Sequence, residues 1–436
     1  MTEPNPMSEQ AALTASRQAR AAAIAGASGI ENALDSGALA RRVDITLSEA
    51  IVLGLLRQNV SNFLCVLGHG ATEVAEVLRI YQEAGLVKAY ALRSEIEASH
   101  AATALRWVTG EKAAVVTSIG PGALHALAAS LAPASDGLGV WYLFGDETTE
   151  DEGPNMQQVP SHEQHGFLRL CSAMGKAYTL HTPLAVSTAL RRGMNTVDHP
   201  HRAGPFYLLM PMNTQANMIK GFNLDELPNG APPPLGEAAD NGSYAEAIDA
   251  ISQARKVVVR VGGGARDAGP EIERLLEATD GVAVTSPLVS GVIPYDHPRN
   301  MTVGGSKGSL SGNYAMENAD LLIAVGSRFV CQSDCSRTGY PNVEHVININ
   351  TDAETATHYS KTTAMVGNAA ATVRRLVDSL LDRGDNRGPS PSEWLTDCAA
   401  RKRAWDEFKE QRYQTPKLLD PMWGREVLTQ PATIKA

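Results

Sequence analysis

The chain has 436 residues, of which 20% are charged and 43% belong to the hydrophobic set, a composition typical of globular proteins with two or three domains. Its formal net charge is −10, which argues against a nucleic-acid backbone or an anionic membrane as the main partner. No apolar run reaches transmembrane length, and the N-terminus lacks a basic-then-apolar signal pattern. We therefore expect a cytosolic protein that binds neither nucleic acid nor membrane.

The five cysteines are scattered along the chain and odd in number. No pair of Cys or His residues completes a zinc spacing. We expect free, mostly buried thiols, without a disulfide framework and without a structural metal site.

The first half of the chain predicts an extension followed by one α/β domain. Residues 1–42 are rich in Ala, Ser and Arg, and they predict an extension with a helix near residues 13–24 that needs a partner surface to become ordered. In residues 43–215, helices alternate with short apolar strands, which predicts a parallel sheet covered on both faces. The expected elements are helix 47–59, strand 63–67, helix 72–84, strand 88–92, a helix from residue 95, strand 113–117, a helix ending at residue 131, strand 140–144 and strand 206–210.

The second half predicts another domain of the same architecture. Residues 216–242 contain clustered prolines and glycines and predict an interdomain linker. Residues 243–383 predict strand 256–261, helix 270–278, strand 282–285, helix 314–318, strand 320–325, strand 345–350 and helix 370–381. Residues 384–436 predict a second linker and a tail with a charged helix over 394–412. The expected fold class is α/β, with two doubly wound parallel-sheet domains.

A single carboxylate, Glu95, stands where a strand gives way to a helix, and a Gly-Pro-Gly turn at residues 120–122 opens a later helix. Ser94 and Glu97 fit a capping box, which assigns Glu97 a structural task and leaves Glu95 without one. An acid beside a glycine turn that lets the backbone approach a ligand favours a functional site. The alternative is that Glu95 is an ordinary surface residue, whose negative charge in the first turn interacts favourably with the helix dipole.

Two histidines are predicted at the same edge of the first sheet. His69 lies between two glycines at the end of a strand, where ligands collect in parallel sheets. It can hydrogen-bond an oxygenated substrate or move a proton, and the alternative is a loop histidine that faces water. His125 lies one turn into the helix after the Gly-Pro-Gly turn. The acidic, polar segment 146–164 predicts a long loop, which carries Gln157.

These motifs, in their order, resemble the pyrimidine-binding domain of thiamine-diphosphate (ThDP) enzymes. The resemblance covers residues 45–381. Within the ThDP enzymes the chain resembles the acetolactate-synthase branch, and within that branch it is most similar to the cyclitol-dione hydrolases. The motifs that carry it are R-S-E (93–95), L-G-H-G (67–70), T-S-I-G-P-G (117–122), G-D (145–146), Q-Q-V (157–159), V-G-G-G (261–264), G-V-I-P-x-D-H-P (291–298), A-D-L to G-S-R (319–328) and I-N-I-N (347–350).

The resemblance implies a role for each candidate residue. Glu95 would hydrogen-bond the ring nitrogen of the cofactor's aminopyrimidine, and Gly120, Pro121 and Gly122 would lie against the cofactor. His69 and His125 would act in catalysis with Glu95. His69, His125 and Gln157 would face the substrate.

Two departures from the family pattern stand out. Many relatives have His where this chain has Ser94, and often Thr-Asn where it has Leu124-His125, so the substrate pocket differs from that of a standard acetolactate synthase. The chain also has no G-D-G motif with a downstream Asn, the pattern that in relatives binds Mg²⁺ and the diphosphate. The resemblance therefore implies that ThDP and Mg²⁺ are anchored mainly by another chain.

We thus expect a subunit of a split ThDP-dependent enzyme, a lyase or carboligase that cleaves or forms a C–C bond next to a carbonyl of a 2-oxo or diketone substrate. A separate diphosphate-binding subunit would complete a hetero-oligomer with two or more copies of each chain. The alternatives are a cyclitol-dione ring-opening hydrolase, a catalytically silent regulatory or scaffold subunit, and a chain that has been cut short. FAD, which some relatives bind in the central domain, remains an open alternative without a supporting motif.

Overall fold

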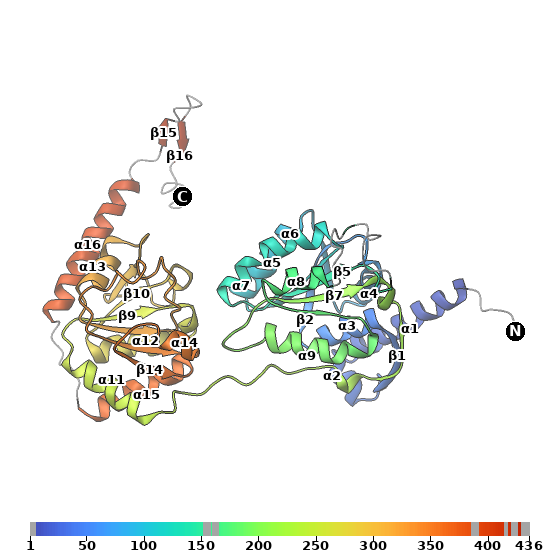
Figure 1. Cartoon of the computed structure of the whole chain (residues 1–436), viewed down its shortest axis with the longest axis horizontal. Helices are drawn as coiled ribbons and strands as arrows, with labels where there is room; N and C mark the ends of the chain where they lie inside the picture. Colours follow the sequence, from blue (N-terminus) through green and yellow to red (C-terminus); the bar gives the residue numbers. More distant parts are fainter. Residues whose placement is uncertain are drawn as a thin grey trace. The chain divides into compact units, whose positions relative to one another are not determined.

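The computed structural model describes residues 6–150, 158, 165–384, 392–413, 417–419 and 426–428. The chain divides into two compact units, Met1–Pro233 and Pro234–Ala436 (Figure 1). Each buried apolar cluster draws its residues from one unit only. The two units are therefore described separately.

Unit 1 is built on a six-stranded sheet in the order β3-β2-β4-β5-β7-β6 with every neighbouring pair parallel. This confirms the predicted parallel sheet. β4 reads K-A-A-V-V-T and is buried along nearly its whole length, as expected for a central strand covered on both faces. The strands are β2 (Val60–Val66), β3 (Lys88–Ala91), β4 (Lys112–Thr117), β5 (Trp141–Asp146), β6 (Lys176–Thr179) and β7 (Phe206–Pro211).

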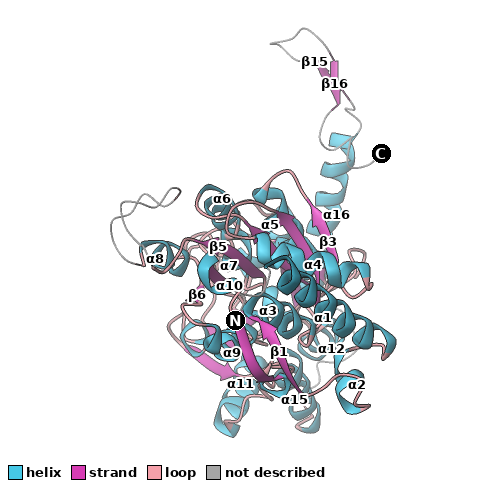
Figure 2. Ribbon diagram, turned by 90° about the vertical axis from the view of Figure 1, so that its right-hand side faces the viewer, coloured by secondary structure: helices cyan, strands magenta, loops and turns pink. Residues whose placement is uncertain are grey.

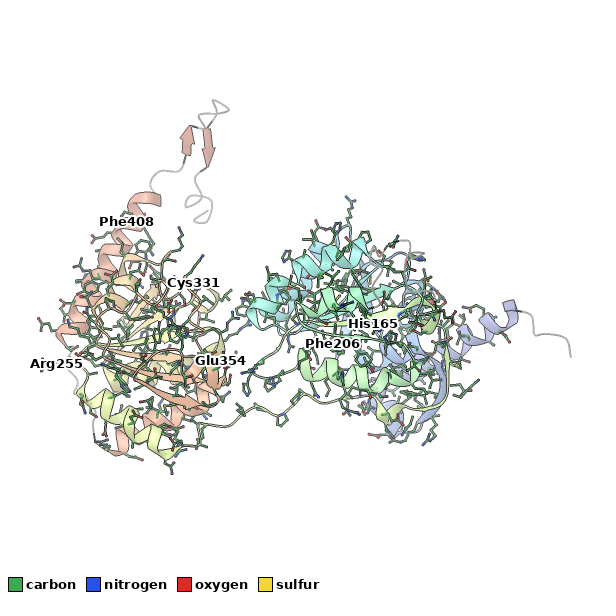
Figure 3. All side chains as sticks on the ribbon, in the orientation of Figure 1. His165, Phe206, Arg255, Cys331, Glu354 and Phe408 are labelled. Atoms are coloured by element: carbon green, nitrogen blue, oxygen red, sulfur yellow. The ribbon has the colours of Figure 1, made fainter. Side chains whose placement is uncertain are left out.

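Helices cover both faces of this sheet (Figure 2). One face packs on α1 (Pro6–Gly26), α2 (Ile30–Asp35), α3 (Leu47–Leu56), α4 (Thr72–Glu83) and α9 (Val186–Val197). The other face packs on α5 (Glu95–Val108), α6 (Pro121–Ala129) and α8 (Gly166–Ser172). Two short helices, α7 (Leu131–Asp136) and α10 (Met212–Gln215), complete the unit. Phe206 of β7, labelled in Figure 3, lies in the buried layer edge-on to Trp141.

Unit 1 extends further at both ends than the sequence predicted. β1 (Arg42–Thr46) pairs antiparallel with β8 (Met218–Asn223), so the start of the predicted linker 216–242 belongs to the fold. The predicted helix near residues 13–24 is present within α1, but its partner surface lies in the same chain. Arg17, Ala21 and Ile24 of α1 are fully buried against unit 1, which a composition rich in Ala and Arg did not reveal.

Unit 2 contains a second parallel sheet in the order β11-β10-β9-β12-β13-β14, which confirms the predicted fold class. The strands are β9 (Val257–Val261), β10 (Val282–Thr285), β11 (Asn300–Val303), β12 (Leu321–Val325), β13 (His345–Asn350) and β14 (Thr362–Val366). One face packs on α11 (Asn241–Gln253), α12 (Gly269–Thr279) and α15 (Ala369–Asp382), and the other on α13 (Leu310–Asn318) and α16 (Glu393–Tyr413). Unit 2 also contains α14 (Ala353–Ala356) and a short antiparallel pair, β15 (Lys417–Leu419) and β16 (Glu426–Leu428).

The glycine run at residues 262–264 serves close backbone packing. A Cβ on Gly262 would lie 2.4 Å from the carbonyl oxygen of Gly326, and the amides of Gly262 and Gly264 donate to the carbonyls of Val325 and Gly326. The run therefore lets the turns after β9 and β12 touch.

Within the described residues, no helix is both long and apolar enough to cross a membrane.

Candidate active site

The candidate residues gather at the carboxyl edge of the unit 1 sheet. The strands β3, β2, β4 and β5 are consecutive neighbours, and all run in the same direction. Their carboxyl ends therefore meet at one edge, the usual ligand-binding edge of such sheets. The segments that follow them carry Glu95, His69, residues 120–122 and Glu147, respectively.

Glu95 is the first residue of α5 and faces His125 of α6. Its side chain is only 14% exposed, and its Oε2 lies 3.3 Å from Nδ1 of His125. Ser94 occupies the N-cap position but makes no capping hydrogen bond with its side chain, so the predicted capping box is wrong. The structure thus brings together two of the three residues predicted to act in catalysis.

The Gly-Pro-Gly turn makes room for the Glu95 carboxylate. A Cβ on Gly122 would lie 2.9 Å from Oε1 of Glu95 and 2.7 Å from Oγ of Ser118, so a larger residue would force these side chains to move. Gly120 adopts a φ of +58°, and a Cβ there would lie 2.3 Å from the carbonyl oxygen of Gln158. Pro121 occupies the first turn of α6, where a missing amide hydrogen is harmless.

His69 lies on a loop whose backbone is held from two sides. Its carbonyl accepts a hydrogen bond from the Ile119 amide at 3.1 Å, and the next carbonyl, of Gly70, accepts one from the buried Gln215 side chain at 2.7 Å. Its imidazole is 41% exposed, and Nε2 lies 3.9 Å from Oε2 of Glu147. Gln157, the predicted substrate contact, lies outside the described residues.

Glu147 and Gln215 are site residues that the sequence analysis missed. Glu147 follows the Gly145-Asp146 pair directly at the end of β5, so its position after a strand-end motif was an available signal. Gln215 is separated from Gly70 by 145 positions, and no local pattern links the two.

The described residues fit one half of a ThDP site. A largely buried carboxylate whose Oε1 lies against a glycine suits a hydrogen bond to a ring nitrogen, which is what the aminopyrimidine half of the cofactor presents. In the described part of the chain, no group of three or more His, Cys, Asp or Glu side chains is placed to hold a metal ion. A diphosphate needs cations or a metal with oxygen ligands.

Comparison with known families supports this assignment. Residues 45–167 match the thiamine pyrophosphate enzyme, N-terminal TPP binding domain, and residues 244–376 match the thiamine pyrophosphate enzyme, central domain. The chain belongs to the thiamine pyrophosphate enzyme family. The predicted family resemblance is therefore confirmed, and thiamine diphosphate, which is the same compound as thiamine pyrophosphate, is the cofactor of that family.

Among curated relatives of this thiamine pyrophosphate enzyme, several are named 3D-(3,5/4)-trihydroxycyclohexane-1,2-dione hydrolase. The protein of Listeria monocytogenes is 25% identical over 375 residues, which cover 83% of this chain and 58% of the relative. That of Lacticaseibacillus casei is 24% identical over 374 residues, covering 83% and 56%. That of Clostridium perfringens is 23% identical over 364 residues, covering 80% and 55%. The chain thus spans a little over half the length of these relatives.

Proposed function

We propose that this chain supplies the pyrimidine-binding half of a ThDP-dependent active site, and that a separate polypeptide supplies the half that binds the diphosphate and Mg²⁺. The complete enzyme would cleave or form a C–C bond next to a carbonyl in a 2-oxo or diketone substrate. The observation that carries the proposal is the Glu95 carboxylate, held between α5 and the Gly122 turn.

Each residue has a defined task in this proposal. When bound, the cofactor supplies a carbon that adds to a carbonyl group and accepts the electron pair of the adjacent bond. Glu95 accepts a hydrogen bond from the pyrimidine ring nitrogen and so holds a proton there. Gly120, Pro121 and Gly122 present backbone to the cofactor. His69 and His125, both substantially exposed, form hydrogen bonds with substrate oxygens.

The surface around Glu95 supports a second protein component. Ile96 on α5, Leu124 on α6 and Leu67 after β2 are each 40% or more exposed, and all three belong to the segments that carry the site. Exposed apolar side chains on the segments that carry the site suit burial under another domain. Such a domain would also exclude water from the site, which strengthens the hydrogen bond made by Glu95.

A second candidate function is the opening of a cyclitol-dione ring by hydrolysis. It is favoured by the relatives in Listeria, Lacticaseibacillus and Clostridium, which are all named 3D-(3,5/4)-trihydroxycyclohexane-1,2-dione hydrolase. Both candidates use the same Glu95 arrangement and differ in the substrate that His69 and His125 would face.

Calorimetry with ThDP and Mg²⁺ tests the proposal. The arms are this chain alone, this chain mixed with a polypeptide from the same genome that carries G-D-G and a downstream Asn, and that mixture with Glu95→Gln. Glu97→Gln is the matched control, because Glu97 is an exposed carboxylate two residues along the same helix. We expect binding only in the mixture, and loss of turnover of pyruvate or a cyclic dione with Glu95→Gln but not with Glu97→Gln.

The remaining outcomes separate the alternatives. Tight binding by this chain alone would show that it holds the diphosphate itself. Absence of binding in every mixture, with Glu95 dispensable, would favour a catalytically silent regulatory or scaffold subunit. Turnover of the dione and not of pyruvate would select the ring-opening hydrolase.

A further inference from the structure

A second carboxylate, Glu147, lies at the same sheet edge as Glu95. It follows β5 directly, and its side chain is only 9% exposed. Its Oε1 is buried without a hydrogen-bond partner in the described part of the chain, and its Oε2 lies 3.9 Å from Nε2 of His69. A buried carboxylate without a fixed donor is destabilising, so its presence calls for an explanation beyond packing.

The surrounding backbone holds His69 and Glu147 together. Gly145, two residues before Glu147, touches Gly70 so closely that a Cβ on Gly145 would lie 2.8 Å from the Gly70 carbonyl carbon. Gly70 is anchored in turn by Gln215. The loops that carry His69 and Glu147 are therefore in direct backbone contact, which keeps the two side chains near each other.

The charge of Glu147 has a specific effect on the His69 ring. A distance of 3.9 Å is longer than a hydrogen bond, so in this conformation the pair interacts through charge, and a small rotation would form the bond. A carboxylate near Nε2 favours the tautomer with hydrogen on Nε2, and a partner at one ring nitrogen commonly decides the tautomer. Nδ1 forms no hydrogen bond with the described residues, and the ring is 41% exposed, so Nδ1 is left as the nitrogen available to a ligand.

We propose that Glu147 is the positioning residue of His69: it orients the imidazole and holds it in the Nε2–H tautomer, so that Nδ1 exchanges a proton with an oxygen of the carbonyl substrate. When the substrate hydroxyl gives its proton to Nδ1, the ring becomes an imidazolium, and the neighbouring Glu147 carboxylate stabilises that charge without itself taking the proton. This inference rests on the proposed function for its substrate class, but the His69–Glu147 pair exists in the free chain.

The tautomer of His69 is measured by NMR on the full chain with ¹⁵N-labelled histidine, without cofactor or partner. The chain has 11 histidines, and the His69→Asn spectrum identifies the His69 signals by their absence. The variants are Glu147→Gln, Glu147→Asp as the conservative rescue, and Glu150→Gln as the control, an exposed acid three residues along. We expect Glu147→Gln to lower the ratio of Nε2–H to Nδ1–H tautomer roughly fivefold or more, since a carboxylate near 4 Å acts strongly in a partly buried site.

The outcomes are distinct. Retention of the wild-type ratio in Glu147→Asp and Glu150→Gln, with a changed ratio in Glu147→Gln, supports the inference. An unchanged ratio in Glu147→Gln overturns it, whatever the activity. In the reconstituted mixture we further expect Glu147→Gln to lower kcat more than KM, with Glu147→Asp partly restoring kcat. If Glu147→Gln changes the tautomer ratio but no mixture turns over substrate, the proposed function is overturned, and the effect of Glu147 on His69 still stands.

Discussion

At the scale of single residues, the site depends on Gly122, which has no Cβ atom. Gly122 is in the first turn of α6, where alanine would ordinarily be the better helix former by about 1 kcal/mol. The close approach of Oε1 of Glu95 and Oγ of Ser118 reverses that preference, because a Cβ would collide with both.

We expect Gly122→Ala to lower the free energy of unfolding by about 1 kcal/mol, because the ends of the Glu95 and Ser118 side chains have to be displaced. Urea unfolding followed by circular dichroism measures this change. Gly204→Ala is the control: nothing lies within 4 Å of a Cβ there, so we expect a change within about 0.5 kcal/mol. An equal effect of the two substitutions would contradict the crowding argument.

The cysteines permit a second test at this scale. Burial raises the pKa of Cys65, Cys171 and Cys398 to about 12 in each case, whereas Cys331, labelled in Figure 3, is exposed. The thiolate is the reactive form, and it predominates only at a pH above the pKa of the thiol. At pH 8, therefore, each of the three buried cysteines is ionised in roughly one molecule in ten thousand. We expect iodoacetamide at pH 8 to modify Cys331 first, and the three buried cysteines only after denaturant is added. Mass spectrometry of tryptic peptides reads the order, and rapid labelling of Cys65 in the folded chain would refute it.

At the scale of elements, α1 is held to unit 1 by a buried charge network. Nε and Nη2 of Arg20 donate to the two oxygens of Glu49 at 2.8 and 2.6 Å, and the Tyr81 hydroxyl donates to Oε1 at 2.9 Å. Arg17 is fully buried, donates to Thr46 at 2.9 Å and lies 3.9 Å from Glu49. A helix whose buried face carries two arginines is stable there only because a buried carboxylate compensates them.

We expect Glu49→Gln to destabilise the chain by about 3–5 kcal/mol, because it removes the carboxylate that Arg20 binds and leaves the buried Arg17 with only the partly exposed Glu73 nearby. Glu73→Gln serves as the control. Glu73 is 37% exposed and lies 3.8 Å from Arg17, so its loss removes less than about 1 kcal/mol. Urea unfolding measures both variants, and protease cleavage within α1 of Glu49→Gln reports whether the helix detaches. A loss below about 1 kcal/mol for Glu49→Gln would show that apolar contacts alone hold α1.

At the scale of the whole molecule, the two units have separate cores. Leu224 and Leu227 are buried in the core of unit 1, and Arg57 donates to both of their carbonyls, at 2.6 and 2.9 Å. Unit 1 thus closes after β8 and not at residue 215. Ala238 is buried in the core of unit 2. The segment between residues 228 and 238 joins two independent cores.

We expect the fragments 1–233 and 234–436 to fold separately, each with a cooperative thermal transition that matches one in the full chain. The control fragment, 1–215, lacks β8 and leaves β1 without its partner at Ile219, so it should unfold at a clearly lower temperature. Calorimetry of the three fragments decides between the two boundaries. Equal transitions for 1–215 and 1–233 would show that β8 contributes nothing to unit 1.

Much of the fold was predictable because its elements carry local signals. The strands near residues 257–261, 321–325 and 345–350 are continuous apolar runs, and the structure has them within a residue or so of the predicted bounds. The strands β6, β11 and β14 were missed. Each has only four or five residues, with polar or charged side chains among them, so a window of that length carries little periodic signal.

The sequence by itself determined the fold class and the edge at which the site forms, because helical and strand periodicities are local and parallel strands align their carboxyl ends. It also singled out Glu95, His69, His125 and the Gly-Pro-Gly turn. Only the tertiary structure decided that Glu95 faces His125, that Glu147 stands beside His69, and that α1 and β8 complete unit 1. The reason is distance along the chain: these contacts join residues 29 to 181 positions apart, and burial and strand pairing between distant segments leave no periodic mark in the sequence.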